Sequence, residues 1–132
     1  MPEKYFTLEE ANSLVPWLNS TFASIQELMS MLAQINPSIR DKSLHLKSNG
    51  NSTTESSLEE LNQEKSRLEK QIEEIVNSIF REGILVKRIE DGLVDFPAIS
   101  GAREIYLCWM FGESNVDFWH ETDTGFAGRQ PV

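Results

Sequence analysis

The stretch Gly92-Leu93-Val94-Asp95-Phe96-Pro97 decides the fold of the second half of the chain. The preceding residues 84–89 form a short segment that contains several β-branched residues. Glu90-Asp91-Gly92 then forms a turn, in which glycine supplies the positive φ of a hairpin. We therefore predict strands over 84–89 and 93–96. Pro97 has no N–H, so we expect donation to the ladder to stop there, after the strand over 93–96.

Two further strands are expected downstream of Ser100-Gly101. Residues 103–111 form the longest strand candidate, and the turn over 112–115 leads into a strand over 116–120. Residues 121–132 contain turn-forming segments and no clear element. The second half is thus predicted to be a small antiparallel sheet of about four strands with an irregular C-terminal tail.

The register of the last two predicted strands determines which side chains share a face. If residues 112–115 form a four-residue loop, Phe111 lies opposite Val116. Cys108 and His120 then point to opposite faces, whereas a bulge would bring them to the same one. Both faces are largely apolar, so the sheet needs cover on each side.

The first half of the chain shows heptad spacing. Thr7 and Glu10 form a capping box, which starts a helix at Leu8. Ser57 and Glu60 offer a second box for a second helix, which ends before Gly83. The apolar seam of the first helix is Leu8, Ala11, Val15, Leu18, Phe22, Ile25, Met29 and Leu32, and that of the second is Leu58, Leu61, Lys65, Leu68, Ile72, Ile75 and Ile79.

These helices, joined by a polar turn over 48–54, predict a long, coiled-coil-like antiparallel hairpin over 8–82 with a polar tip near 48–57. We expect a kink at Pro16. Beyond Pro37 the first helix either continues to about Lys47 or stops near residue 35. The predicted fold is α+β, one domain over 1–132, with the hairpin followed by a β-rich head and tail over 84–132.

Charge and composition exclude several classes of function. A net charge of −9 disfavours both nucleic acid and anionic membrane surfaces as partners. The chain has one cysteine and no secretory signal pattern at its start, so we expect a cytoplasmic protein. Between Ala11 and Ile35 the only charged residue is Glu27. A helix with so little charge is usually covered on more than one side, which predicts a homodimer paired through the first helix, with Leu28 and Met31 as contacts.

Most chemically active residues lie in the second half. The candidate ligand or anion site comprises Asp95, Arg103, Glu113, His120 and Arg129. The structural alternative is that Asp95, an acid within an apolar strand, simply pairs with Arg103 or Arg129.

Two further chemical interpretations involve His120. A metal site would use His120, Glu121 and Asp123, although no second His or Cys stands at a typical ligand spacing. A Cys108–His120 nucleophile pair is disfavoured, because Cys108 lies between Leu107 and Trp109 as a small apolar core residue would. The sequence points to no particular cofactor.

Several motifs together resemble an uncharacterised family of small bacterial and archaeal proteins, the domain-of-unknown-function family numbered 2203. They are Gly-Leu-Val-Asp-Phe-Pro-Ala (92–98), Tyr-Leu-Cys-Trp (106–109), Gly-Glu (112–113), Trp-His (119–120), Gly-Phe-Ala-Gly-Arg (125–129), the opening Phe-Thr-Leu-Glu-Glu-Ala-Asn and Pro16-Trp17. The resemblance covers essentially the whole chain and implies no activity, substrate or cofactor.

Two functions therefore remain open. The first is a non-catalytic, oligomeric interaction or structural protein that docks a protein partner. The second is a small-ligand or metal site, possibly enzymatic, around His120, Asp95 and Arg129. Closed pairs of the charged groups in a filled core favour the first, and their convergence on an open cavity favours the second.

Overall fold

The computed structural model describes residues 4–49 and 52–132, and the side chains of residues 45–54 fall outside the description. The chain divides into two compact units. The head unit comprises Met1–Ala23 and Val76–Val132, and the hairpin unit comprises Ser24–Ile75. The prediction of a single domain over 1–132 stays a prediction.

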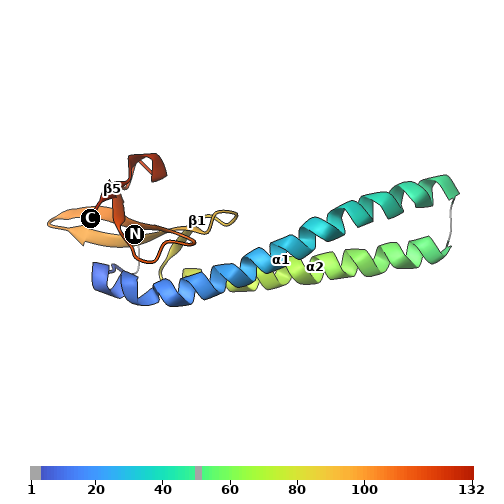
Figure 1. The fold of residues 1–132 in the computed structure, drawn as a ribbon, viewed down its shortest axis with the longest axis horizontal. Helices are drawn as coiled ribbons and strands as arrows, with labels where there is room; N and C mark the ends of the chain where they lie inside the picture. Colours follow the sequence, from blue (N-terminus) through green and yellow to red (C-terminus); the bar gives the residue numbers. More distant parts are fainter. Residues whose placement is uncertain (1–3, 50–51) are drawn as a thin grey trace. The chain divides into compact units, whose positions relative to one another are not determined.

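Two helices and a five-stranded antiparallel sheet make up an α+β fold, as predicted (Figure 1). The helices are α1 (Leu8–Asn49) and α2 (Ser52–Arg81). The remaining elements are β1 (Leu85–Arg88), β2 (Leu93–Ser100), β3 (Arg103–Met110), β4 (Phe118–Glu121), the 3-10 helix η1 (Phe126–Gly128) and β5 (Gln130–Pro131). Neighbours in sequence are neighbours in the sheet, so the topology is a simple meander.

The start of α1 confirms the predicted capping box. The Thr7 amide donates to the Glu10 carboxylate at 2.9 Å, and the Glu10 amide donates to Thr7 Oγ1 at 3.0 Å. The helix continues through Pro37 to Asn49, which decides between the two alternatives at that proline. The kink at Pro16 stays a prediction.

The predicted start of the second helix is wrong. α2 begins at Ser52, so Ser57 lies inside the helix and does not cap it, and most of the predicted polar turn over 48–54 is helical. Residues 50 and 51 lie outside the described residues. Gly83 follows α2 with φ of +91°, the left-handed conformation expected after a helix.

In the hairpin unit the heptad seam is only partly covered. Ile25 and Leu68 are buried, but most seam positions are half-buried. The half-buried positions are Met29, Leu32, Leu58, Leu61, Lys65, Ile72 and Ile75. In the described part of the chain, neither helix contains an apolar segment long enough to cross a membrane.

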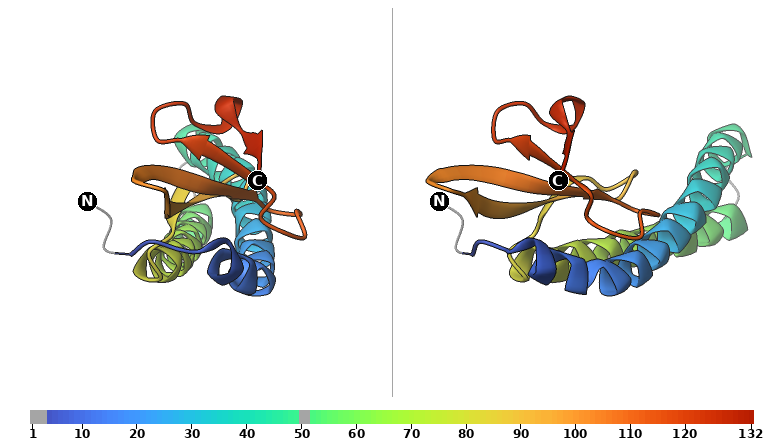
Figure 2. Two further views of the ribbon diagram at one scale, coloured as in Figure 1. Left: turned by 90° about the vertical axis from the view of Figure 1, so that its left-hand side faces the viewer. Right: turned by 60° about the vertical axis from the view of Figure 1, so that its left-hand side comes forward.

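The head unit is layered, with the start of α1 on one face of the sheet and the C-terminal tail on the other (Figure 2). On the helix face the Phe22 ring lies 6.1 Å from that of Trp109, and the Phe6 ring lies edge-on to Phe96 at 5.1 Å. The side chains of this core are buried: Phe6, Ala11, Val15, Leu18, Phe22, Ile79, Ile84, Val94, Phe96, Leu107, Trp109 and Val116. These aromatic contacts position β2 and β3, which carry the candidate site on their other face.

Strand β2 runs through Pro97 to Ser100, so the predicted end at Pro97 is wrong. The Pro97 carbonyl accepts the Phe6 amide at 2.7 Å and therefore points away from β3. The N–H and C=O of one strand residue face the same side, so the N–H that proline lacks would also point away from β3. On that side β1 pairs with β2 only as far as Asp95. The proline thus removes no bond that the sheet would otherwise make.

The tail contains two elements that the sequence did not indicate. The η1 turn follows β4, and β5 then pairs antiparallel with β4, Trp119 opposite Gln130. The sheet therefore has five strands rather than about four. The fifth strand has only two residues, which is too short for alternation of apolar and polar positions to reveal it.

The predicted register of β3 and β4 is wrong. Tyr106 lies opposite His120 and Cys108 lies opposite Phe118, so Phe111 does not pair with Val116. The connection spans residues 111–117 and is longer than the four-residue loop assumed. The pairing differs from the predicted one by one residue, and such a slip moves a strand's side chains to the other face.

Candidate functional site

Asp95, Cys108 and His120 meet on the face of the sheet beneath the tail, which we call the site face. Asp95 lies directly opposite Cys108 in the β2–β3 ladder, and His120 comes from β4 on the far side of β3. One ligand atom from each of the three side chains lies within 4.8 Å of the others. All three residues are buried, with exposed fractions of 1–2%.

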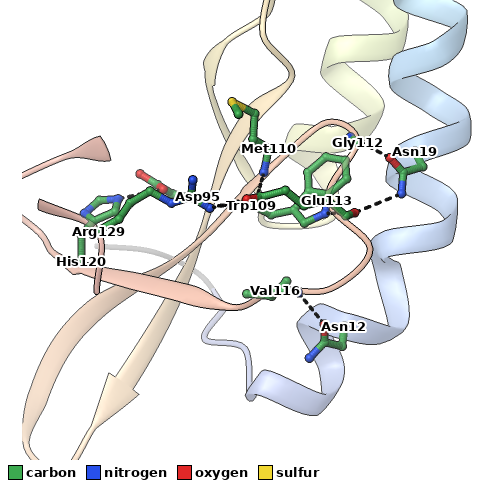
Figure 3. Close-up of polar contacts among 10 residues, drawn as sticks. All are labelled: Asn12, Asn19, Asp95, Trp109, Met110, Gly112, Glu113, Val116, His120 and Arg129. Atoms are coloured by element: carbon green, nitrogen blue, oxygen red, sulfur yellow. Dashed lines mark hydrogen bonds and ion pairs between the residues drawn. The ribbon is translucent and has the colours of Figure 1, made fainter. Parts of the chain in front are cut away.

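Hydrogen bonds fix the orientation of the His120 ring. Nδ1 lies 2.7 Å from the carbonyl oxygen of Glu121. Nε2 lies 2.9 Å from Oδ1 of Asp95 (Figure 3). A carbonyl only accepts, so Nδ1 carries a proton and donates it. The Nε2 atom then shares a second proton with the Asp95 carboxylate, which makes a charged or proton-sharing pair in a buried position.

The environment of Cys108 opposes ionisation. Burial, followed by the negative charge of Asp95, raises the pKa of the Cys108 thiol from 9.0 to about 12, while Arg129 acts in the opposite direction. Reactive cysteines need a lowered pKa and partial exposure. The shared face therefore removes the geometric objection to a Cys108–His120 nucleophile, but the protonated, buried thiol argues against it.

A second pair of charged side chains lies beside the trio. Arg129 Nη2 donates to both carboxylate oxygens of Glu113, at 2.8 and 2.9 Å, and Glu113 Oε1 also accepts the Met110 amide at 2.8 Å. The Arg129 guanidinium lies 4.0 Å from the centre of the Phe118 ring and 4.7 Å from that of Phe126. Ion pairing and ring contacts together fasten the tail over the site face.

The loop over 111–117 is anchored by two asparagines of α1. The Val116 amide donates to Asn12 Oδ1 at 2.6 Å, and the Gly112 amide donates to Asn19 Oδ1 at 3.2 Å (Figure 3). Asn19 Nδ2 in turn donates to the Glu113 carbonyl at 3.4 Å. The helix thus sets the path of the loop that delivers Glu113 and determines where β4 begins.

Of the five candidate ligand residues, the structure brings together four. Asp95, Glu113, His120 and Arg129 form two pairs, Asp95–His120 and Glu113–Arg129. Arg103 pairs instead with Glu121 at 2.8 Å, with more than half of its side chain exposed. The predicted pairing of Asp95 with either arginine is therefore wrong, because the actual register brings His120 to its side.

The structure also regroups the residues proposed for a metal. Glu121 lies on the helix face of β4 with its carboxylate on Arg103, and Asp123 is exposed, so neither joins the His120 ring. Asp95 and Cys108 take their place beside His120. Sequence reasoning missed Cys108 as a member of this group because it assumed the shorter loop.

Comparison with known proteins places the chain in a family without giving it an activity. The family model described as "Uncharacterized conserved protein (DUF2203)" matches residues 4–132. The chain belongs to this family. Searches of curated proteins and of solved structures gave no match. The family membership agrees with the resemblance seen in the sequence motifs.

Proposed function

We propose that this protein is a non-catalytic interaction or structural protein that works as a homodimer, with the hairpin units of two copies paired along α1. The observation that carries the proposal is the incomplete cover of the seam in the hairpin unit. Apart from Ile25 and Leu68, the described seam positions of that unit are half-buried or more exposed.

Two helices enclose an apolar seam on two sides only. In a four-helix arrangement the same positions become an enclosed core, and a second copy supplies the two missing helices. Met31 adds to this argument, because it lies outside the seam on α1 and is 42% exposed. Burying an apolar side chain at such a position against a partner is favourable and stabilises the dimer.

Charge favours α1 over α2 as the contact surface. Two copies of a chain with a net charge of −9 repel each other unless they approach along a neutral surface. From Ala11 to Ile35 the first helix contains only Glu27 as a charged residue, whereas α2 has a solvent-exposed face rich in glutamate. Pairing along α1 keeps those glutamates apart.

The head unit supports the non-catalytic part of the proposal. The charged groups form two pairs, the buried Asp95–His120 and the half-buried Glu113–Arg129, in which each charge already has a partner. Cys108 is held as a neutral thiol. Groups arranged in this way stabilise a fold more readily than they attack a substrate.

Sedimentation equilibrium tests the dimer directly. We expect the wild-type protein to be dimeric at tens of micromolar, and a monomer at that concentration would contradict the proposal. Met31→Glu would place a charge in the contact and should raise the dimer Kd at least about tenfold. Ser66→Glu, which adds the same charge at an exposed position of α2, should change the Kd by less than about threefold. Equal effects of both variants would argue against pairing along α1.

A further inference from the structure

We propose that Asp95, Cys108 and His120 form a binding site for one divalent transition-metal ion of the zinc class, in the head unit beneath the tail. The proposal goes beyond the dimer, which involves the hairpin unit, and does not depend on it. Its basis is the convergence of sulfur, imidazole nitrogen and carboxylate oxygen from three adjacent strands within 4.8 Å.

The His120 ring is already oriented as a metal ligand. Histidines that bind metals usually donate their second ring N–H to a carboxylate or a backbone carbonyl, which fixes the ring and its tautomer. Nδ1 of His120 makes such a bond, at 2.7 Å to the Glu121 carbonyl. The Nε2 atom therefore points into the group of three, where it faces Oδ1 of Asp95 at 2.9 Å.

This arrangement needs a positive charge between two acceptors. With Nδ1 already donating, Nε2 has only a lone pair unless the ring takes up a second proton, and an ionised carboxylate also only accepts. A proton satisfies the pair, and so does a metal ion bound to both atoms. The adjacent Cys108 sulfur supplies a third ligand to the ion.

The distances suit a small ion after modest movement of side chains. Around tetrahedral zinc, with bonds of about 2.0–2.3 Å, neighbouring ligand atoms lie about 3.3–3.8 Å apart. The Nε2 and Oδ1 atoms must separate slightly from 2.9 Å, and the widest separation must close from at most 4.8 Å. The second oxygen of Asp95 or a water molecule completes four ligands. A sulfur ligand favours zinc-class ions over magnesium and calcium.

The charge balance also suits a buried site. Binding a divalent ion displaces the thiol proton of Cys108 and the proton shared by His120 and Asp95, because metal ligands must be deprotonated. Two protons leave as one ion of charge two enters, so the net charge of the buried group does not change. The positive charge of the nearby Arg129 repels the ion only weakly, because the Glu113 carboxylate accepts hydrogen bonds from Arg129 Nη2 and balances that charge.

The group lies out of contact with solvent, since Asp95, Cys108 and His120 are each only 1–2% exposed. In the tail beside it, the Phe126 ring lies 4.7 Å from the Arg129 guanidinium and 5.9 Å from that of Arg88 on β1. A dry shell strengthens the attraction between the ion and its charged ligands.

Cobalt spectroscopy of the 132-residue chain tests the site. Chelator-treated protein is titrated with Co²⁺ alone, and we expect saturation at one equivalent with a near-ultraviolet sulfur-to-cobalt charge-transfer band. Zn²⁺ should displace the cobalt and abolish the band. Saturating Zn²⁺ should also raise the Tm of the head unit, followed by tryptophan fluorescence, by about 5 °C or more. Absence of both the band and the Tm shift in the wild-type protein overturns the proposal, whatever the variants do.

Variants then assign the ligands. Cys108→Ala should remove the charge-transfer band, and Asp95→Asn should weaken Co²⁺ binding at least about tenfold. Glu121→Gln is the matched control, since it removes a partly exposed carboxylate next to His120 but keeps the backbone carbonyl that orients the ring. Retention of the band in Cys108→Ala, or its loss in Glu121→Gln, would overturn the proposed ligand set.

Discussion

In the metal-free protein, the free energy of unfolding of the head unit should fall less steeply above pH 9 when Cys108 is replaced by alanine. In the folded protein the thiol pKa is about 12, against an ordinary value of 9.0. Above pH 9 the unfolded chain therefore loses the thiol proton while the folded chain keeps it. The free energy of unfolding falls by about 1.4 kcal/mol for each pH unit in that interval, because the folded state binds more protons.

The contribution of the thiol is fully present below pH 9 and lost as the pH rises toward 12. From well below pH 9 to well above pH 12 the loss amounts to about 4 kcal/mol, and between pH 9 and pH 11 to about 2 kcal/mol. Cys108→Ala removes the titrating group and leaves a small cavity. The cavity lowers stability by an amount that does not depend on pH. The amount by which the free energy of unfolding of the wild type exceeds that of Cys108→Ala should therefore fall with rising pH.

Urea unfolding followed by tryptophan fluorescence measures this difference in the right part of the molecule, since Trp17, Trp109 and Trp119 all belong to the head unit. Tyr5 also titrates at high pH, with a pKa raised mainly by its hydrogen bond to Glu104. It is present in both proteins, so its effect cancels in the comparison. If the two curves of stability against pH run parallel from 9 to 11, Cys108 is not held as a neutral thiol. The argument against a nucleophile would then fail.

Two further predictions use matched pairs, with head-unit stability measured by the same fluorescence assay. Gly92→Ala should cost about 3 kcal/mol or more, because φ is +63° and the new Cβ would lie 2.4 Å from a neighbouring Cβ. Gly101→Ala has the same φ but open space around it and should cost only about 1 kcal/mol, so equal costs would contradict the steric argument. Glu113→Gln leaves the largely buried Arg129 without a counter-charge and should cost about 2–3 kcal/mol. Glu121→Gln breaks a partly exposed pair and should cost less than about 1 kcal/mol, and a loss as large as that of Glu113→Gln would contradict this order.

The parts of the fold that local sequence determines could be predicted. The capping box at Thr7 and Glu10 involves residues three apart, and the heptad seams repeat within each helix, so both are visible without knowledge of the tertiary fold. The start of α2 could not be predicted in this way. Ser57 and Glu60 have the composition of a capping box, but the helix had already begun at Ser52.

The candidate site stays a prediction. Of its five residues, four lie in two pairs, Asp95–His120 and Glu113–Arg129, while Arg103 pairs with Glu121. Their partners could not be predicted, because an ion pair between strands depends on register, and register depends on the length of the connecting loop. The assumption of a four-residue loop separated Cys108 from His120 and left an arginine as the apparent partner of Asp95.

The register of β4 in turn depends on contacts far away in sequence. Past the end of β3 the chain folds back on itself, with the Trp109 indole N–H donating to the Glu113 carbonyl at 3.0 Å and the Met110 amide donating to the Glu113 carboxylate. Asn12 and Asn19 then hold the loop from α1. These bonds delay β4 to Phe118 and determine which face His120 occupies. Packing of the helix against the sheet is thus what brings the imidazole beside the thiol and the carboxylate, and a site built on all three depends on α1 although no residue of that helix belongs to it.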